Sequence, residues 1–103
     1  MCYPNTLPAT TPENALFPLG HIVATPGALD LLDRSGTNGF DLIRRHQKGD
    51  WGNVPPEDAA ANQEGIRMGF RLLSSYFLNE QERLWIITEA DRSVTTLLLP
   101  EEY

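Results

Sequence analysis

The chain has 103 residues, of which 41% are hydrophobic and 21% are charged, and this composition is typical of one globular domain. Fourteen acidic residues against eight Lys and Arg give a net charge of −6, and basic residues cluster only at Arg44, Arg45 and Lys48, so we do not expect nucleic acid as a ligand. No apolar run approaches the ~20 residues that cross a bilayer, and no signal peptide is recognisable, so we expect a cytoplasmic protein without a membrane partner.

Cofactor and metal motifs are scarce. The single cysteine, Cys2, and the two histidines, His21 and His46, stand at spacings that match no zinc site. The eight glycines form neither a GxGxxG motif nor a P-loop. The sequence therefore predicts no cofactor and no metal.

The N-terminal segment is rich in proline, with Pro4, Pro8 and Pro12 in its first sixteen residues. Proline lacks an amide donor and biases the preceding residue away from the helix. We therefore predict an extended or disordered arm at residues 1–16, which Leu16, Phe17 and Leu19 dock onto a single domain at residues 17–103.

Helices are predicted to follow a short strand at residues 21–25. The first is capped by Thr25, begins at Pro26 and stops at Gly36. A second lies between residues 37 and 49, and a third runs from residue 55 or 56 to Gly69. The apolar positions expected to face the core of the first two helices are Ala28, Leu29, Leu31, Leu32, Phe40, Leu42 and Ile43.

Three strands, at residues 70–78, 83–88 and 93–99, are predicted to form an antiparallel meander. If NEQE (79–82) is the first turn, Tyr76 lies opposite Trp85. Both faces of these strands are apolar, so we expect the helices to cover one face and the N-terminal arm, residues 21–25 or a second protein to cover the other. The predicted fold class is α+β, with N-terminal helices packed on a C-terminal antiparallel meander of three or four strands.

The first candidate site is RRHQKGDWG (44–52), where a histidine, a carboxylate and a tryptophan occur within six residues. His46, Asp50 and Trp51 could form a binding corner, because Trp and Arg often anchor interfaces. The alternative is structural, since cations favour the end of a helix and Asp can bond to turn backbone.

The second candidate site is TEADR (88–92), a polar cluster between two apolar runs. It is either a solvated strand connection or a recognition surface that contains Thr88, Glu89, Asp91 and Arg92. One hypothesis joins the two sites: Asp50 and Trp51 approach this loop, and Arg92 pairs with Asp50 or Glu89.

The segments LGHIVATPGAL, RRHQKGDWG, WIITEADRS and LLPEEY give the chain a resemblance to a family of bacterial proteins of roughly a hundred residues. Members of this family are often carried on plasmids and other mobile elements and have no assigned activity. The resemblance covers residues 17–103, and it implies a host-interaction or counter-defence role.

We therefore expect a non-enzymatic protein-binding module with an acidic surface, which would act as a mobile-element accessory or counter-defence inhibitor. Its partner would be another protein with a basic surface, or a second copy of itself. One alternative is a small enzyme that uses His46 with Asp50, Glu89 or Asp91 as an acid and base pair. Another is a homodimer that buries the second face of the sheet.

Overall fold

The computed structural model describes residues 15–103, so most of the predicted arm, with Cys2, lies outside the described residues. The elements are β2 (His21–Ala24), α1 (Pro26–Ser35), α2 (Gly39–Gln47), α3 (Pro56–Met68), β3 (Leu72–Phe77), β4 (Arg83–Thr88), β5 (Val94–Leu98) and the 3-10 turn η2 (Pro100–Glu102). The α+β prediction is confirmed, because the helices precede most of the sheet along the chain. Within residues 15–103, no helix combines the length and the apolar composition that a membrane crossing needs.

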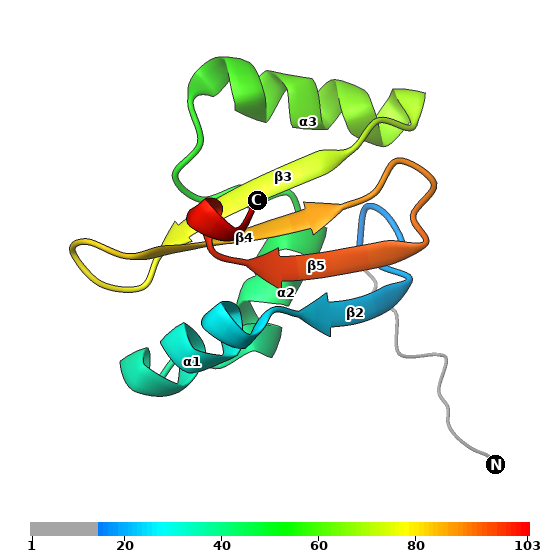
Figure 1. Cartoon of the computed structure of the whole chain (residues 1–103). Coiled ribbons are helices and arrows are strands. Elements are labelled where there is room, and N and C mark those ends of the chain that lie inside the picture. The colour runs from blue at the N-terminus through cyan, green and yellow to red at the C-terminus, as the bar shows by residue number, and fades with distance from the viewer. Residues whose placement is uncertain (1–14) are drawn as a thin grey trace, which may run out of the picture.

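The sheet has four strands in the order β2-β5-β4-β3 (Figure 1). β3, β4 and β5 form the predicted antiparallel meander. β2 adds to its edge in parallel to β5, with Ile22 opposite Thr95 and Ala24 opposite Leu97. The short N-terminal strand therefore extends the sheet and does not cover its second face.

The ends of the helices follow the local signals in the sequence. The Thr25 hydroxyl accepts a hydrogen bond from the Ala28 N–H at 3.1 Å, and α1 ends at Gly36, whose φ of 67° is left-handed. Asn38 caps α2 by accepting from the Phe40 N–H at 2.9 Å. These contacts confirm the predicted start and stop of α1 and the predicted cap of α2.

The predicted register of β3 and β4 is wrong by one residue. Tyr76 lies opposite Leu84, and Trp85 lies opposite Ser75. β3 ends at Phe77, which lies opposite Arg83 at the start of β4, so the connecting loop has five residues and not four. Because side chains alternate along a strand, Tyr76 and Trp85 lie on opposite faces of the sheet.

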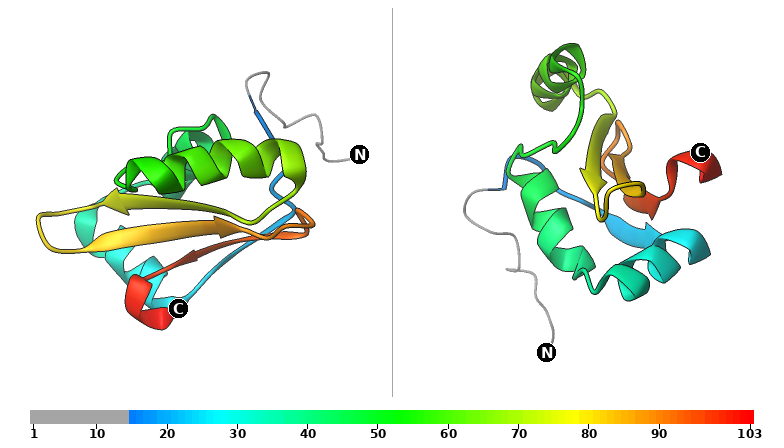
Figure 2. Two further views of the ribbon diagram at one scale, coloured as in Figure 1. Left: turned by 90° about the horizontal axis from the view of Figure 1, so that it is seen from above. Right: turned by 90° about the vertical axis from the view of Figure 1, so that its left-hand side faces the viewer.

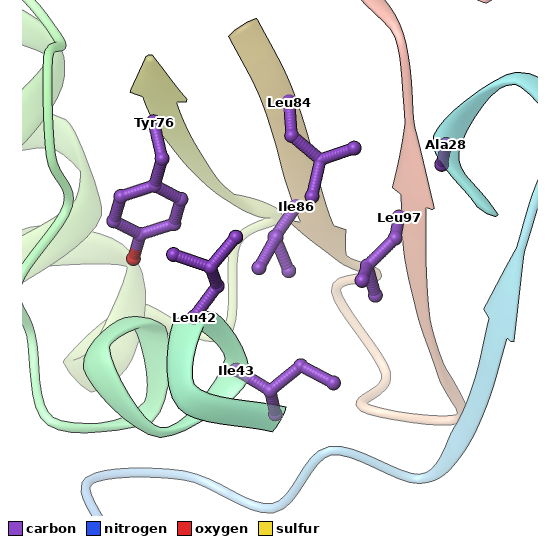
Figure 3. Packing of buried hydrophobic residues seen from close by; sticks show 7 residues of the cluster. All are labelled: Ala28, Leu42, Ile43, Tyr76, Leu84, Ile86 and Leu97. Carbon is purple, nitrogen blue, oxygen red and sulfur yellow. The ribbon is translucent and has the colours of Figure 1, made fainter. Parts of the chain in front are cut away.

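The main core lies between the sheet and the pair α1–α2, which cover one face, while α3 runs along the β3 edge (Figure 2). Phe17 and Leu19 dock the start of the domain, as predicted, whereas Leu16, which was predicted to dock with them, is 46% exposed. The buried side chains that fill the core are Ala28, Leu42, Ile43, Tyr76, Leu84, Ile86 and Leu97 (Figure 3).

The second face of the sheet is partly covered by the C-terminus. The ring of Tyr103 stands edge-on to Trp85 at 5.8 Å, and the Arg71 guanidinium lies 5.3 Å from the same ring. Ile87 and Leu98 are buried on this face. The C-terminal turn therefore supplies cover that we expected from the arm, from residues 21–25 or from another protein.

Candidate functional site

His46 lies within a buried chain of hydrogen bonds that links α2 to three strands. Its Nδ1 contacts the Ser74 hydroxyl on β3, and its Nε2 lies 2.9 Å from the Thr88 hydroxyl on β4. The Thr88 oxygen is 2.8 Å from the Thr95 oxygen on β5. Thr95 in turn donates to the backbone carbonyl of Leu19 at 2.8 Å.

The direction of each hydrogen bond follows from the last acceptor, because a carbonyl oxygen cannot donate. The Thr95 hydrogen points to Leu19, so the Thr88 hydroxyl donates to Thr95 and must itself accept from His46 Nε2–H. Nδ1 is then the acceptor for the Ser74 hydroxyl. Every hydrogen bond of a neutral imidazole is satisfied, and one tautomer is selected.

The surroundings keep this ring uncharged. His46 is fully enclosed, with Phe17 and Trp51 edge-on to it at 5.2 and 5.6 Å. Burial, followed by the nearby positive charge of Arg92, lowers the pKa of His46 to about 3. His46 is therefore a neutral core residue at physiological pH.

This geometry contradicts the predicted pairing of His46 with a carboxylate. The ring nitrogens are occupied by Ser74 and Thr88, both 0% exposed. A general base needs a substrate within hydrogen-bond reach, and the enclosed ring offers no such position. The Ser74–His46 contact has the residue types of a nucleophilic pair, but it holds the sheet to α2.

Asp50 pairs with Arg45 and not with Arg92. Arg45 Nε donates to the Asp50 carboxylate at 2.7 Å, and this bond holds the Asp50 pKa below its usual value. The Arg45 guanidinium also lies over the Tyr76 ring, whose hydroxyl donates to the Asp50 carbonyl at 2.6 Å. The GDWG turn is therefore fastened to α2 and to β3.

The Arg92 side chain donates hydrogen bonds to backbone carbonyls rather than to a carboxylate. Its guanidinium donates to the carbonyls of Gly65 at 2.9 Å, Phe70 at 2.7 Å and Glu89 at 3.1 Å. It also lies 5.7 Å from the ring of Phe17. The hypothesis that Arg92 pairs with Asp50 or with the Glu89 side chain is thus wrong, and Arg92 ties the TEADR turn to the end of α3.

The two predicted motifs do approach one another, but through a residue that belongs to neither. The ring of Phe17 stacks on Trp51 at 6.2 Å, and Arg92 lies over the same Phe17 ring. Of the other predicted site residues, Thr88 is buried, while Asp91 is exposed and bonds Ser93 in its own turn. Glu89, the last of them, is half-buried at the end of β4.

The outer edge of β3 is closed by side chains and by the GDWG turn. Asn62 of α3 bonds both backbone groups of Leu73, at 2.7 and 3.1 Å. The Ser75 N–H donates to the Trp51 carbonyl at 3.0 Å, and the Ser75 carbonyl accepts from Asn53. No strand can add here without displacing these contacts.

The outer edge of β2 is open in the described part of the chain. The N–H groups of His21 and Thr25 bond the carbonyls of Ser93 and Leu97 on β5. Because backbone groups alternate along a strand, the N–H and C=O of Ile22 and Ala24 point away from β5. β2 is the last strand of the sheet, so these four groups face outward.

An apolar groove of about 400 Å³ lies beside this open edge, between β2 and the α1–α2 pair. Among its lining residues, Phe40 is 62% exposed, Leu29 is 57% exposed and Ile22 is 43% exposed. None of the described residues that line it carries a charge. Together with the free backbone of β2, this groove is the candidate binding surface.

Sequence reasoning missed this surface because it assigned Leu29 and Phe40 to the core. In α1, only Ala28 and Leu31 are fully buried, and Leu29 lies about 100° around the helix from Ala28. The four apolar residues of α1 therefore form a face wider than the part of the helix that the core buries. The width of this apolar face was the feature of the sequence that could have indicated an exposed surface.

No group of three or more His, Cys, Asp or Glu side chains within residues 15–103 could hold a metal ion. No protein-family model, curated protein or solved structure matches the chain. The family resemblance stays a prediction, and the candidate surface is defined by the geometry of this chain.

Proposed function

We propose that this chain is a non-enzymatic protein-binding module that engages its partner through the groove of Ile22, Leu29 and Phe40 and the open edge of β2. The observation that carries the proposal is the juxtaposition of free backbone groups with exposed apolar side chains. An extended segment that pairs with an open strand gains main-chain hydrogen bonds, while neighbouring pockets receive its alternate side chains. A groove without charged lining suits an apolar segment.

The test compares groove variants with variants at equally exposed apolar positions elsewhere. Leu29→Ser with Phe40→Ser alters the groove, and Met68→Ser with Phe77→Ser is the matched control, since Met68 and Phe77 are 55% and 48% exposed. We expect the first pair to lose partner binding, measured by capture from a native lysate or by self-association, and the second pair to retain it. Equal binding by two folded variants would overturn the proposal.

The narrower role of a mobile-element inhibitor with an acidic surface is supported by the net charge of −6. It makes a different prediction about salt. Electrostatic capture of a basic partner weakens steeply between low and high ionic strength, whereas burial of an apolar groove does not. Binding that survives 1 M salt but is lost in the groove variant would favour the groove over the acidic surface.

A further inference from the structure

The two edges of the sheet differ in whether their outward backbone groups already have hydrogen-bond partners. At β3, Asn62 and the backbone of the GDWG turn occupy the groups that a further strand would use. At β2, the strand HIVA carries no charged residue, proline or bulge that would discourage pairing. Within residues 15–103, the sheet therefore has one closed edge, at β3, and one unprotected apolar edge, at β2.

This difference between the two edges limits how copies of the chain can associate. If β2 of one copy paired with β3 of the next, the copies would form an open fibre, but the β3 edge is closed. Pairing of β2 with β2 of another copy uses the same surface twice and leaves no free edge, so assembly stops at two chains.

We infer that two copies of this chain associate through β2, antiparallel about a twofold axis at Val23, to form one continuous eight-stranded sheet. This inference rests on the proposed function and names the partner of the same surface. The bond pattern determines the register. Gly20, with a φ of 67°, ends the strand on one side, and Pro26 has no N–H on the other.

Only Ile22 and Ala24 then offer outward N–H and C=O groups. The register that uses all four in each copy pairs Ile22 with Ala24 of the second copy, so that the two residues exchange both of their backbone hydrogen bonds. Val23, which is 46% exposed, then stands directly opposite Val23 of the second copy. That position is a non-hydrogen-bonded pair, in which side chains approach most closely.

Polar side chains meet at the two ends of this pairing. In the same register His21 of one copy stands opposite Thr25 of the other. The Thr25 hydroxyl donates to the Glu102 carboxylate, which also accepts from the Gly27 N–H at 3.2 Å. The imidazole of each copy therefore meets a carboxylate of the other, at two symmetric positions.

On the helix side, Ile22 of each copy lies beside the groove of Leu29 and Phe40. The added strand brings apolar side chains of the second copy to this groove, where they cover the exposed ring of Phe40. The dimer therefore buries the edge of the sheet, which differs from the expectation that a dimer would bury its second face.

The test is disulfide trapping in a Cys2→Ser background, where the only thiol is the one introduced. Val23→Cys, Ile22→Cys and Ala24→Cys are oxidised under mild conditions, and the cross-linked fraction is followed with time. We expect Val23→Cys to cross-link about tenfold faster than either neighbour, because only this position faces itself across the axis. Equal rates at all three positions, or fastest trapping at Ile22 or Ala24, would overturn the register.

A second measurement needs no cysteine. Light scattering after gel filtration should give twice the 11.5 kDa mass of one chain for the wild type and for Phe77→Lys. Val23→Lys places two ammonium groups opposite each other and should give a folded monomer. A wild type that stays monomeric at high concentration overturns the inference. If such a monomer still binds another protein, and the variant Leu29→Ser with Phe40→Ser does not bind it, the proposed function survives without the dimer. If that variant binds the other protein as well as the wild type does, the proposed function and the dimer are both wrong.

Discussion

The side-chain amide of Asn62 bonds both backbone groups of Leu73, donating to its carbonyl at 2.7 Å and accepting from its N–H at 3.1 Å. One helical side chain thus takes the place of a neighbouring strand at the edge of β3. Asn62 is buried, although it lies on a helix whose apolar stripe is poor. It is both an anchor for α3 and a cap on the sheet.

Asn62→Ala is expected to lower the free energy of unfolding by about 2 kcal/mol, because it leaves two backbone groups without partners. Urea denaturation measures the change. Gln63→Ala, at the neighbouring exposed position of α3, is the control and should stay within about 0.5 kcal/mol of the wild type. A similarly small effect at Asn62 would show that water replaces the amide at no cost.

Gly52 and Gly36 test two different reasons why a position in this fold requires glycine. Both have left-handed φ, at 75° and 67°. A Cβ at Gly52 would overlap the Ser75 carbonyl oxygen, while a Cβ at Gly36 would meet nothing within 4 Å. We expect Gly36→Ala to cost about 1 kcal/mol from backbone strain alone, and Gly52→Ala to cost at least twice as much. Equal losses in thermal denaturation would contradict the close approach of the GDWG turn to β3.

The buried imidazole makes the fold sensitive to acid. The folded pKa of His46, about 3, lies below the ordinary value of about 6.5. The unfolded chain therefore binds a proton first, so the contribution is fully present above pH 6.5 and is lost as pH falls toward 3. Between pH 7 and 5 we expect a loss of about 2 kcal/mol, a window above the range in which ordinary carboxylates titrate.

His46→Gln should remove this pH dependence, although it also lowers stability at pH 7 by disturbing the hydroxyl chain. His21→Gln is the matched control, because His21 lies on the surface. Chemical denaturation at pH 7 and 5 gives the comparison. If His46→Gln keeps the wild-type slope, the enclosed histidine is not its source.

Arg92 combines a strained backbone with a supporting side chain. Its φ is 61°, and its guanidinium bonds the carbonyls of Gly65 and Phe70. Arg92→Ala is expected to cost about 2–3 kcal/mol, since these charge-assisted bonds are lost. Arg92→Gly should cost about 1 kcal/mol less, because glycine relieves the left-handed conformation. The order of the two melting temperatures tests this, with Arg67→Ala, an exposed change on α3, as control.

Features that depend on near neighbours along the chain were predictable. The cap of Thr25, the stop at Gly36 and the alternation of β4 and β5 involve contacts within a few residues or the intrinsic dihedral preferences of one residue. Such signals act in the unfolded chain as well, so they can be read without the fold. They were sufficient for the helices, the meander and the α+β class.

The candidate sites were harder, because burial depends on residues far away in the chain. His46 contacts Ser74 and Thr88, which lie 28 and 42 residues further on, and only these contacts turn a titratable side chain into a neutral core residue. Trp51 looked like an interface anchor, yet Phe17 covers it.

The proposed binding surface also depends on contacts between residues that lie far apart in the sequence. Composition and pattern by themselves determined an acidic α+β domain with helices before a meander. Only the tertiary structure decided that β2 lies at an edge, that Asn62 closes the opposite edge, and that Phe40 faces solvent beside free backbone groups. β2 pairs with β5, which lies about seventy residues further along the chain, and no local preference encodes which strand remains without a second neighbour.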